Sequence, residues 1–410
     1  SYLPAPEPRQ MRYLQNRWLA AILGRLEEWT MHHRRPIYVL TALVLAVSIA
    51  GMFRLQSEGF ILDDLPKNDP LYTDLKFFEK NFKGVMPLEI VIDTKRRKGL
   101  RAGTVRLLDS IDQLSQYIAA RPEMARPLSL EEGLKFIRQA YYGGDSSAYE
   151  VPNSTDFAFL SQYMGSDSAG KAGATASKQN FLTQLKTSFV DTNQQRLRIS
   201  ISMADIGSKR LPVVLAELEQ KARSLFDSSK YKVEFTGTSV TYLEGSAFVI
   251  KGLKDSIQWS FLLIAACMLA LFRSVRILFC SLVPNVIPLI VTAGLMGWVG
   301  VRLKPSTVIV FSIALGIAID ITIRFLVNFK QERTGTAQAV IDTIGKTGIS
   351  IIYTSLVLIA GFVIFCFSDF GGILALGWLT SITLVVATMT NLIFLPVLLL
   401  TLTKSRQDRS

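Results

Sequence analysis

The chain has 410 residues, a formal net charge of +12 and a mean hydropathy of +0.31. That mean hydropathy is too high for an ordinary soluble protein, yet the apolar residues are not spread evenly. They cluster at 37–53 and 257–400, and the polar block between these runs is long enough to bury its own core. The composition therefore predicts one membrane domain, split in sequence, and one domain inserted after its first helix.

The positive charge is concentrated outside the polar block. Residues 55–255 hold 27 Lys and Arg residues against 25 Asp and Glu residues, a net charge of +2, so the rest of the chain holds +10. Membrane topology explains such an excess, because cytoplasmic loops are enriched in Lys and Arg. The polar block has no basic face interleaved with aromatic residues, so nucleic acid is not an expected partner.

The cysteine and histidine residues indicate no special chemistry. All three cysteines lie in apolar runs, at Cys267, Cys280 and Cys366, where packing is the expected role. The only histidines, His32 and His33, directly precede Arg34 and Arg35 and are expected near water or lipid headgroups. The chain has no P-loop, nucleophile elbow, zinc motif or dinucleotide-binding fingerprint. Neither an enzyme nor a cofactor or metal is expected.

Residues 1–35 are expected to form a linker and a helix at the cytoplasmic membrane surface. A helical stripe of apolar residues over 10–30 includes Trp18 and Trp29, with arginines elsewhere on the turn. Such a helix suits the membrane interface, and packing against a protein is the alternative. The basic pair Arg34-Arg35 then places the start of the first membrane helix in the cytoplasm. That helix is expected at 36–54.

Residues 55–255 are expected to form an α+β domain outside the membrane. The clearest strands are 87–93, with the sequence PLEIVID, and 196–203, where apolar and polar residues alternate. A strand and helix, a Gly-, Ser- and Ala-rich insert at 143–178, and a strand–helix–strand series indicate a split β-α-β arrangement. The other predicted elements are helices at 103–120, 128–140, 155–164 and 211–226 and a strand at 231–236.

Five further membrane spans are expected over residues 256–403, which makes six in all. The last is long, so a break or tilt is expected near Pro396. Basic residues concentrate in the segments that this topology assigns to the cytoplasm, including the tail at 404–410, so both chain ends are expected there. The five spans are 256–272, 277–299, 305–328, 348–367 and 373–402.

Two features of the third helix are interpreted first as structural. Pro284, Asn285 and Pro288 form a motif that would break the helical hydrogen-bond ladder, which is tolerated where neighbours satisfy the freed groups. Three glycines spaced three residues apart suit close helix packing, namely Gly294, Gly297 and Gly300.

The fourth helix carries an acid and a base in an otherwise apolar run, residues 308–326. Asp320 and Arg324 are four residues apart, which places both on one face of a helix. On insertion scales a charge at the centre of a membrane helix costs roughly 2.5–3.5 kcal/mol, so ionisable residues there are functional candidates. A locked ion pair is the structural alternative.

Six features occur in an order that resembles one known family. A single span and a large outside domain are followed by four motifs: Thr236-Gly237-Thr238-Ser239, Pro284–Pro288, Gly316-Ile317-Ala318-Ile319-Asp320, and Lys346-Thr347-Gly348-Ile349-Ser350 leading to Thr354-Ser355-Leu356. This order resembles one six-helix half of a resistance-nodulation-division (RND) superfamily transporter. It is most similar to the MMPL-type, hydrophobe-exporter branch, which also resembles Patched-like and sterol-sensing proteins. The resemblance covers residues 10–403.

The resemblance implies an integral membrane α-helical fold with an inserted extracytoplasmic porter-like domain. A complete transporter would have twelve helices in two such repeats, and the Pro-rich start looks like the linker before the second, so we expect the C-terminal half. The implied partners are a second half (the N-terminal half of the same protein or another copy), a lipid or hydrophobic small-molecule substrate, and periplasmic accessory proteins. The implied location is the bacterial inner membrane, with the large domain in the periplasm.

The resemblance also implies a proton site. The family often has two adjacent acids in the fourth helix and a His one turn later. Here Asp320 matches the first acid, whereas Ile321 and Arg324 replace the other two groups. An acid beside an arginine is held ionised. Two interpretations stay open: Asp320 cycles protons with help from the other half, or this half is structural and the other half couples to protons.

Thr354 and Ser355 lie at the family's hydroxyl position on the fifth helix. They would hydrogen-bond Asp320 if the two helices adjoin, and bonding to their own helix backbone is the alternative. The resemblance thus predicts half of a transporter driven by the proton-motive force that moves lipids or other hydrophobic molecules. A lipid sensor or scaffold of the sterol-sensing kind is the alternative. The predicted proton-relay residues are Asp320, Arg324, Thr354 and Ser355, and the predicted packing and motif residues are Gly316, Pro284, Asn285 and Pro288.

Overall fold

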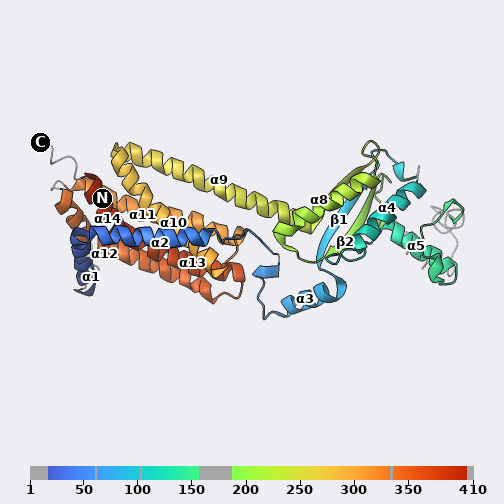
Figure 1. Ribbon diagram of the computed structural model, residues 1–410, viewed down its shortest axis with the longest axis horizontal. Helices are drawn as coiled ribbons and strands as arrows, with labels where there is room; N and C mark the ends of the chain where they lie inside the picture. The colour runs from blue at the N-terminus through green and yellow to red at the C-terminus, as the bar shows by residue number, and fades with distance from the viewer. Residues whose placement is uncertain (1–16, 61, 102–103, 157–186, 333–335, 404–410) are drawn as a thin grey trace, which may run out of the picture. The chain divides into compact units, whose positions relative to one another are not determined.

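The structure, a computed structural model, describes residues 17–60, 62–101, 104–156, 187–332 and 336–403. The chain divides into two compact units (Figure 1). The α+β unit comprises residues 60–246, and the helical unit comprises residues 1–59 and 247–410.

The α+β unit contains a three-stranded sheet. Its middle strand is β1 (Met86–Asp93), with which β2 (Arg196–Met203) and β3 (Lys232–Thr236) both pair antiparallel. β2 and β3 are therefore parallel to each other, and α8 (Gly207–Leu225) connects them across β1. This is the split β-α-β arrangement predicted from the strand and helix order.

The helices of the α+β unit follow the sequence patterns with one exception. The helices predicted at 103–120 and 128–140 are confirmed as α4 (Thr104–Ala119) and α5 (Leu130–Tyr141), while the helix predicted at 155–164 lies almost entirely outside the described residues. The patterns do not predict α3 (Pro70–Phe82). Short 3-10 turns also occur at η2 (Leu62–Asp64), η3 (Gly99–Arg101) and η4 (Ser146–Ala148).

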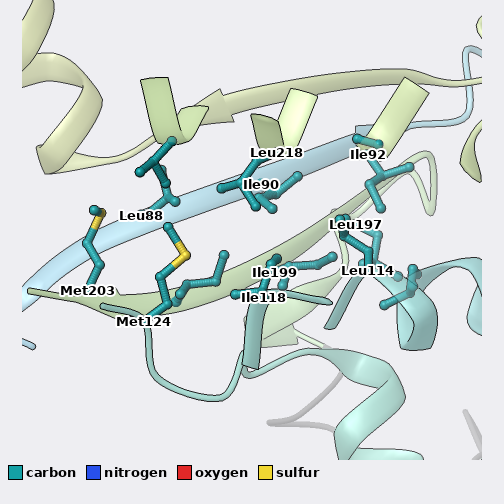
Figure 2. Close-up of a cluster of buried hydrophobic side chains, with 14 of the residues drawn as sticks. Leu88, Ile90, Ile92, Leu114, Ile118, Met124, Leu197, Ile199, Met203 and Leu218 are labelled. Atoms are coloured by element: carbon teal, nitrogen blue, oxygen red, sulfur yellow. The ribbon is translucent and has the colours of Figure 1, made fainter. Parts of the chain in front are cut away.

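Alternation along β1 builds the core of this unit. Successive side chains of a strand point to opposite faces of the sheet, and Leu88, Ile90 and Ile92 are fully buried on one of them. Leu218 of α8 and Ile118 of α4 belong to the same buried cluster (Figure 2). The two helices therefore complete a hydrophobic core with the sheet, as the amphipathic patterns of both segments require.

Among the described residues of the chain, six helical segments are long and apolar enough to cross a membrane. They overlap the six predicted spans, although the second begins at Thr238 rather than at residue 256 and the fifth at Ala337 rather than at residue 348. The protein is thus a multi-pass α-helical membrane protein. The spans are α2 (Arg34–Met52), α9 (Thr238–Phe272), α10 (Val275–Val299), α11 (Pro305–Gln331), α12 (Thr336–Val363) with η5 (Ile364–Phe367), and α13 (Gly371–Met389) with η6 (Thr390–Phe394) and α14 (Leu395–Thr403).

The first helix, α1 (Arg17–His32), packs against protein along one side. Leu23 is buried, and a Cβ atom added to Gly348 of α12 would lie only 2.6 Å from Leu23 Cδ2. Trp29 is exposed on the other side of α1. The alternative that α1 packs against protein therefore holds for its buried face. Trp29, on the exposed face, can contact lipid headgroups.

The predicted glycine contact is confirmed between α10 and α2. A Cβ atom on Gly294 would lie 2.4 Å from Ser48 O, and one on Gly297 would lie 1.9 Å from Gly51 O. The two backbones approach so closely that neither position accommodates a methyl group. Gly300 has a different role, because it ends α10 in the left-handed conformation at φ 79°.

The proline motif does not break α10, which continues through Pro284 and Pro288. Because Pro288 has no N–H, the Pro284 carbonyl loses its helical partner. Thr390 Oγ1 lies 3.3 Å from that carbonyl oxygen, and it also lies 3.0 Å from Val386 O and Ala387 O of its own helix. Thr390 begins η6, a π-helical turn immediately before Pro396, where the last span was expected to break.

Candidate functional site

The centre of α11 holds the predicted acid–base pair. With a rise of 1.5 Å per residue, this helix is about 40 Å long, and Asp320 lies near its middle. Arg324 Nε donates to Asp320 Oδ2 at 3.1 Å, and Arg324 Nη2 contacts the same oxygen. Both donors meet one carboxylate oxygen, so the ion pair is present, as the spacing predicts.

This ion pair is not buried by the described part of the chain. The side chains of Asp320 and Arg324 are 55% and 40% exposed. Ile309 and Gly316 are exposed on the same stripe of α11. Gly316, predicted as a packing residue, contacts no other element of the described chain, because a Cβ atom there would meet nothing within 4 Å. This face of α11 is open.

The structure does not bring the two predicted hydroxyls to the acid. Thr354 Oγ1 donates to Ser350 O at 3.0 Å, which is the backbone alternative. Ser355 is buried, and its Oγ has no hydrogen-bond partner within the described residues. The predicted hydrogen bonds from these hydroxyls to Asp320 are therefore absent from the described part of the structure. Thr354 instead donates to its own helix, and Ser355 Oγ reaches no acceptor among the described residues.

The opposite face of α11 carries a polar contact between three segments, here called the Thr322 node: Thr322, Asn285 and Asn391. Thr322 Oγ1 lies 2.9 Å from Asn285 Oδ1 of α10 and 2.6 Å from Asn391 Oδ1 of η6. All three residues are at most 1% exposed. Interhelical hydrogen bonds in membranes contribute about 0.6 kcal/mol on average. The main effect of the node is therefore to determine which segments contact each other, and its contribution to stability is small.

Each amide of the node is held by its own helix. Asn285 Nδ2 donates to Ser281 O at 2.7 Å, and Asn391 Nδ2 donates to Ala387 O at 2.9 Å. Both bonds span four residues, so the amide oxygens point away from their own helices and towards Thr322. Asn285, predicted as a motif residue for helix packing, thus acts through hydrogen bonds rather than through shape.

Sequence reasoning missed Thr322 and Asn391. The available signal was their polarity, since a buried polar group in an apolar run needs a hydrogen-bond partner. Thr388, Thr390 and Asn391 form a polar cluster inside the last span. That cluster, read together with Asn285, would have predicted a buried contact between the third and sixth membrane helices.

The α+β unit contains a second acid–base group, here called the Lys135 cluster: Lys135, Glu131, Glu132 and Asp112. The Lys135 ammonium contacts the carboxylates of Asp112 and Glu131 and lies 3.6 Å from Glu132. Glu131 is fully buried. Burial raises the pKa of Glu131 to about 7, partly opposed by the neighbouring Lys135. Three acids thus share one lysine, and Glu131 titrates near neutral pH.

No metal centre accompanies these sites in the described ranges. Groups of three or more His, Cys, Asp or Glu side chains that could hold a metal ion are absent there. The chemistry that the described groups offer is proton exchange and hydrogen bonding.

One comparison identifies the kind of protein to which the chain is similar. The sequence pattern of the MMPL family matches residues 150–410, which is more than half of the chain. The matched region includes β2, α8, β3 and all spans from α9 onwards. A search of curated proteins found no match.

Proposed function

The chain belongs to the MMPL family, a family of membrane transporters, and from this we propose that it is half of a proton-driven transporter of lipids or other hydrophobic molecules. At the level of the family it is a transporter of hydrophobic substrates and not an enzyme. The finer proposal concerns the energy source, the substrate and the missing half. One observation carries it, namely the open ion pair of Asp320 and Arg324 on α11.

An open ion pair at mid-span is unfavourable against lipid. Each charge exposed to hydrocarbon costs several kcal/mol, roughly 2.5–3.5 on insertion scales. The described chain leaves about half of each side chain uncovered. A second protein surface that covers this stripe of α11 removes the cost. We assign that surface to a second six-helix half, either an N-terminal half of the same protein or another copy.

The chemistry of the pair constrains that second half. When Asp320 takes up a proton, Arg324 loses its only ion-pair partner among the described residues. A lone buried guanidinium is costly, and arginine does not release its proton. The covering surface must therefore offer Arg324 another acceptor, for which a carboxylate is the best fit. Protonation would then pass Arg324 from one acid to the other and move α11.

The charge distribution favours one orientation in the membrane. The excess of basic residues near the ends of the spans supports cytoplasmic termini, and the α+β unit, which follows α2 directly, would then lie in the periplasm of a bacterial inner membrane. Hydrophobic substrates would reach that side from the outer leaflet. Periplasmic accessory proteins would receive them there.

The test is proton flux in the complete transporter. Asp320→Asn, reconstituted with both halves in proteoliposomes that contain trapped pyranine and a fluorescent phosphatidylethanolamine, should lose at least about tenfold of the lipid-dependent proton flux. The matched control is Asp369→Asn, the same change at an exposed loop position, which should retain it. Normal flux in Asp320→Asn would show that this half does not carry the proton. Loss of flux in both variants would indicate damage unrelated to the site.

A further inference from the structure

The Thr322 node has fewer hydrogens than acceptors. Three oxygen atoms lie within hydrogen-bond distance of Thr322 Oγ1: Asn285 Oδ1 at 2.9 Å, Asn391 Oδ1 at 2.6 Å and Ala318 O at 3.1 Å. A hydroxyl has one hydrogen and donates one full hydrogen bond at a time. The Ala318 carbonyl belongs to the helix of Thr322 itself. The two amide oxygens therefore compete for the one hydrogen that can join α11 to another segment.

The amide groups cannot relieve this shortage by turning over. Reversing Asn285 would place its oxygen against Ser281 O, where its NH2 group now donates at 2.7 Å. Reversing Asn391 would place its oxygen against Ala387 O in the same way. Two facing oxygens repel, so the hydrogen-bond network fixes both amide orientations. Each amide oxygen remains an acceptor directed at Thr322.

Burial makes the competition consequential. Thr322 and Asn391 are fully buried and Asn285 is 1% exposed, so bulk water does not reach the node through the described chain. A buried acceptor that receives no hydrogen bond is costly. Whichever oxygen lacks the hydrogen is therefore an unsatisfied buried acceptor, and Asn391 Oδ1 lies nearer to the hydroxyl, at 2.6 Å, than Asn285 Oδ1, at 2.9 Å.

The two acceptors belong to different kinds of segment. Asn285 lies in α10, which meets α2 backbone to backbone at Gly294 and Gly297. Asn391 lies in η6, a π-helical turn, which interrupts the regular helical ladder and is a frequent feature of functional sites. The choice of acceptor thus decides whether α11 is joined to α10 or to η6.

We infer that Thr322 is a positioning residue that acts as a two-position latch, donating to Asn285 in one state of the protein and to Asn391 in the other. Asp320 and Thr322 lie two residues apart on opposite faces of one rigid helix. Movement of α11 caused at the ion pair must therefore pass through the latch. The inference takes one element from the proposed function, namely that α11 moves during the transport cycle.

The experiment follows the separation of α11 from α10 in the complete transporter in nanodiscs. Spin labels are placed at Arg276 and Gln331, two exposed positions at the start of α10 and the end of α11, with the native cysteines replaced by alanine. Pulsed electron paramagnetic resonance gives the distribution of the distance between the labels. The latch predicts two populations in it: a short distance when Thr322 donates to Asn285 of α10, and a long distance when it donates to Asn391. Asn391→Leu leaves Asn285 as the only side-chain acceptor and should enrich the short separation. Asn285→Leu should enrich the long one.

The ratio of the short-distance to the long-distance population should change about threefold in each asparagine variant, in opposite directions. A threefold change corresponds to the free energy of about one hydrogen bond in a membrane. Thr322→Ser keeps the hydroxyl and should match the parent, whereas Thr322→Val should abolish the difference between the two asparagine variants. Shifts of the same sign, or no shift, would overturn the latch. If the leucine variants do not fold, alanine variants at the same positions decide the question by the same criterion.

This readout is independent of transport. Opposite shifts in a protein without proton flux would support the latch and reject the proposed energy source. Shifts of equal sign in a protein with normal flux would reject the latch and leave the proposed function intact.

Discussion

Two acid–base pairs with the same helical spacing have opposite surroundings in this protein. Glu131 and Lys135 in α5, like Asp320 and Arg324 in α11, are four residues apart. The α5 side chains are 0% and 6% exposed, whereas the α11 side chains are 55% and 40% exposed. The pair in the α+β unit is buried, and the pair in a membrane span is open.

This difference in exposure is the reverse of what water around the α+β unit and hydrocarbon around a membrane span would favour in a complete protein. Charges can remain in water at little cost, but they are costly in hydrocarbon. The α+β unit completes its pair with Asp112, Glu132 and the hydroxyl of Ser129, which donates to Glu131 at 3.2 Å. The described part of α11 has no such additional partners for its pair. This contrast supports the proposal that another half completes the membrane pair.

The largest expected effect is at Lys135. Lys135→Met leaves three carboxylates without their shared cation, and breaking a buried pair costs about 3–5 kcal/mol. Hydrogen exchange of α4 and α5 in the purified protein measures this loss. Lys232→Met, which removes a lysine from an exposed pair with Glu234, is the control and should cost under about 1 kcal/mol. Equal losses would show that burial does not distinguish the two pairs.

The next effect is the pH dependence that Glu131 imposes. Its pKa is about 7 in the folded state, against 4.5 for the ordinary side chain. The folded state therefore binds the proton more tightly, so stability is full below pH of about 4.5 and declines until about pH 7. The decline is at most about 3 kcal/mol. Thermal unfolding across this range should show it, and Glu131→Gln should remove it.

A matched control for the pH dependence is Glu219→Gln, the same change in an exposed pair. It should leave the decline in place. A decline that persists unchanged in Glu131→Gln would mean that another group causes it.

The smallest effect is expected at Arg324 in this chain alone. In detergent, where no second half covers α11, the pair lies against alkyl chains. Arg324→Ala then removes one charge that is costly in hydrocarbon at the same time as it breaks the pair, so the net change in stability should be under about 1 kcal/mol. In the complete transporter the same change should cost several kcal/mol, because Asp320 is then a lone buried charge. Replacing both residues by leucine should restore the stability of the complete transporter. Equal costs in both settings would contradict a covering half.

The elements of this fold follow closely from local sequence. Alternation in 196–203 predicts β2 to the residue, and six apolar runs predict the six spans. The spacing of Asp320 and Arg324 predicts their ion pair. The helix α3 is missed because its apolar residues stay exposed: Leu71, Phe77 and Phe82 pack into no core, although the helix has a good N-cap in Asp69.

The contacts between helices could not be predicted from patterns within single segments of the sequence. Whether Thr354 and Ser355 reach Asp320 depends on how α12 is rotated against α11, and no periodicity in one helix fixes that rotation. The Thr322 node depends on three segments that are 37 and 69 residues apart in sequence. The motif of Pro284 and Pro288 predicts the lost helical hydrogen bond, but not its replacement, because the hydroxyl of Thr390 that reaches the Pro284 carbonyl comes from another span.

The glycine contact between α2 and α10 has a mechanical consequence. With backbone atoms of Ser48 and Gly51 lying where a side chain of Gly294 or Gly297 would begin, the two helices meet backbone to backbone. A methyl group at either glycine would force the helices apart, so the pairing of α2 with α10 depends on two side chains that are not there.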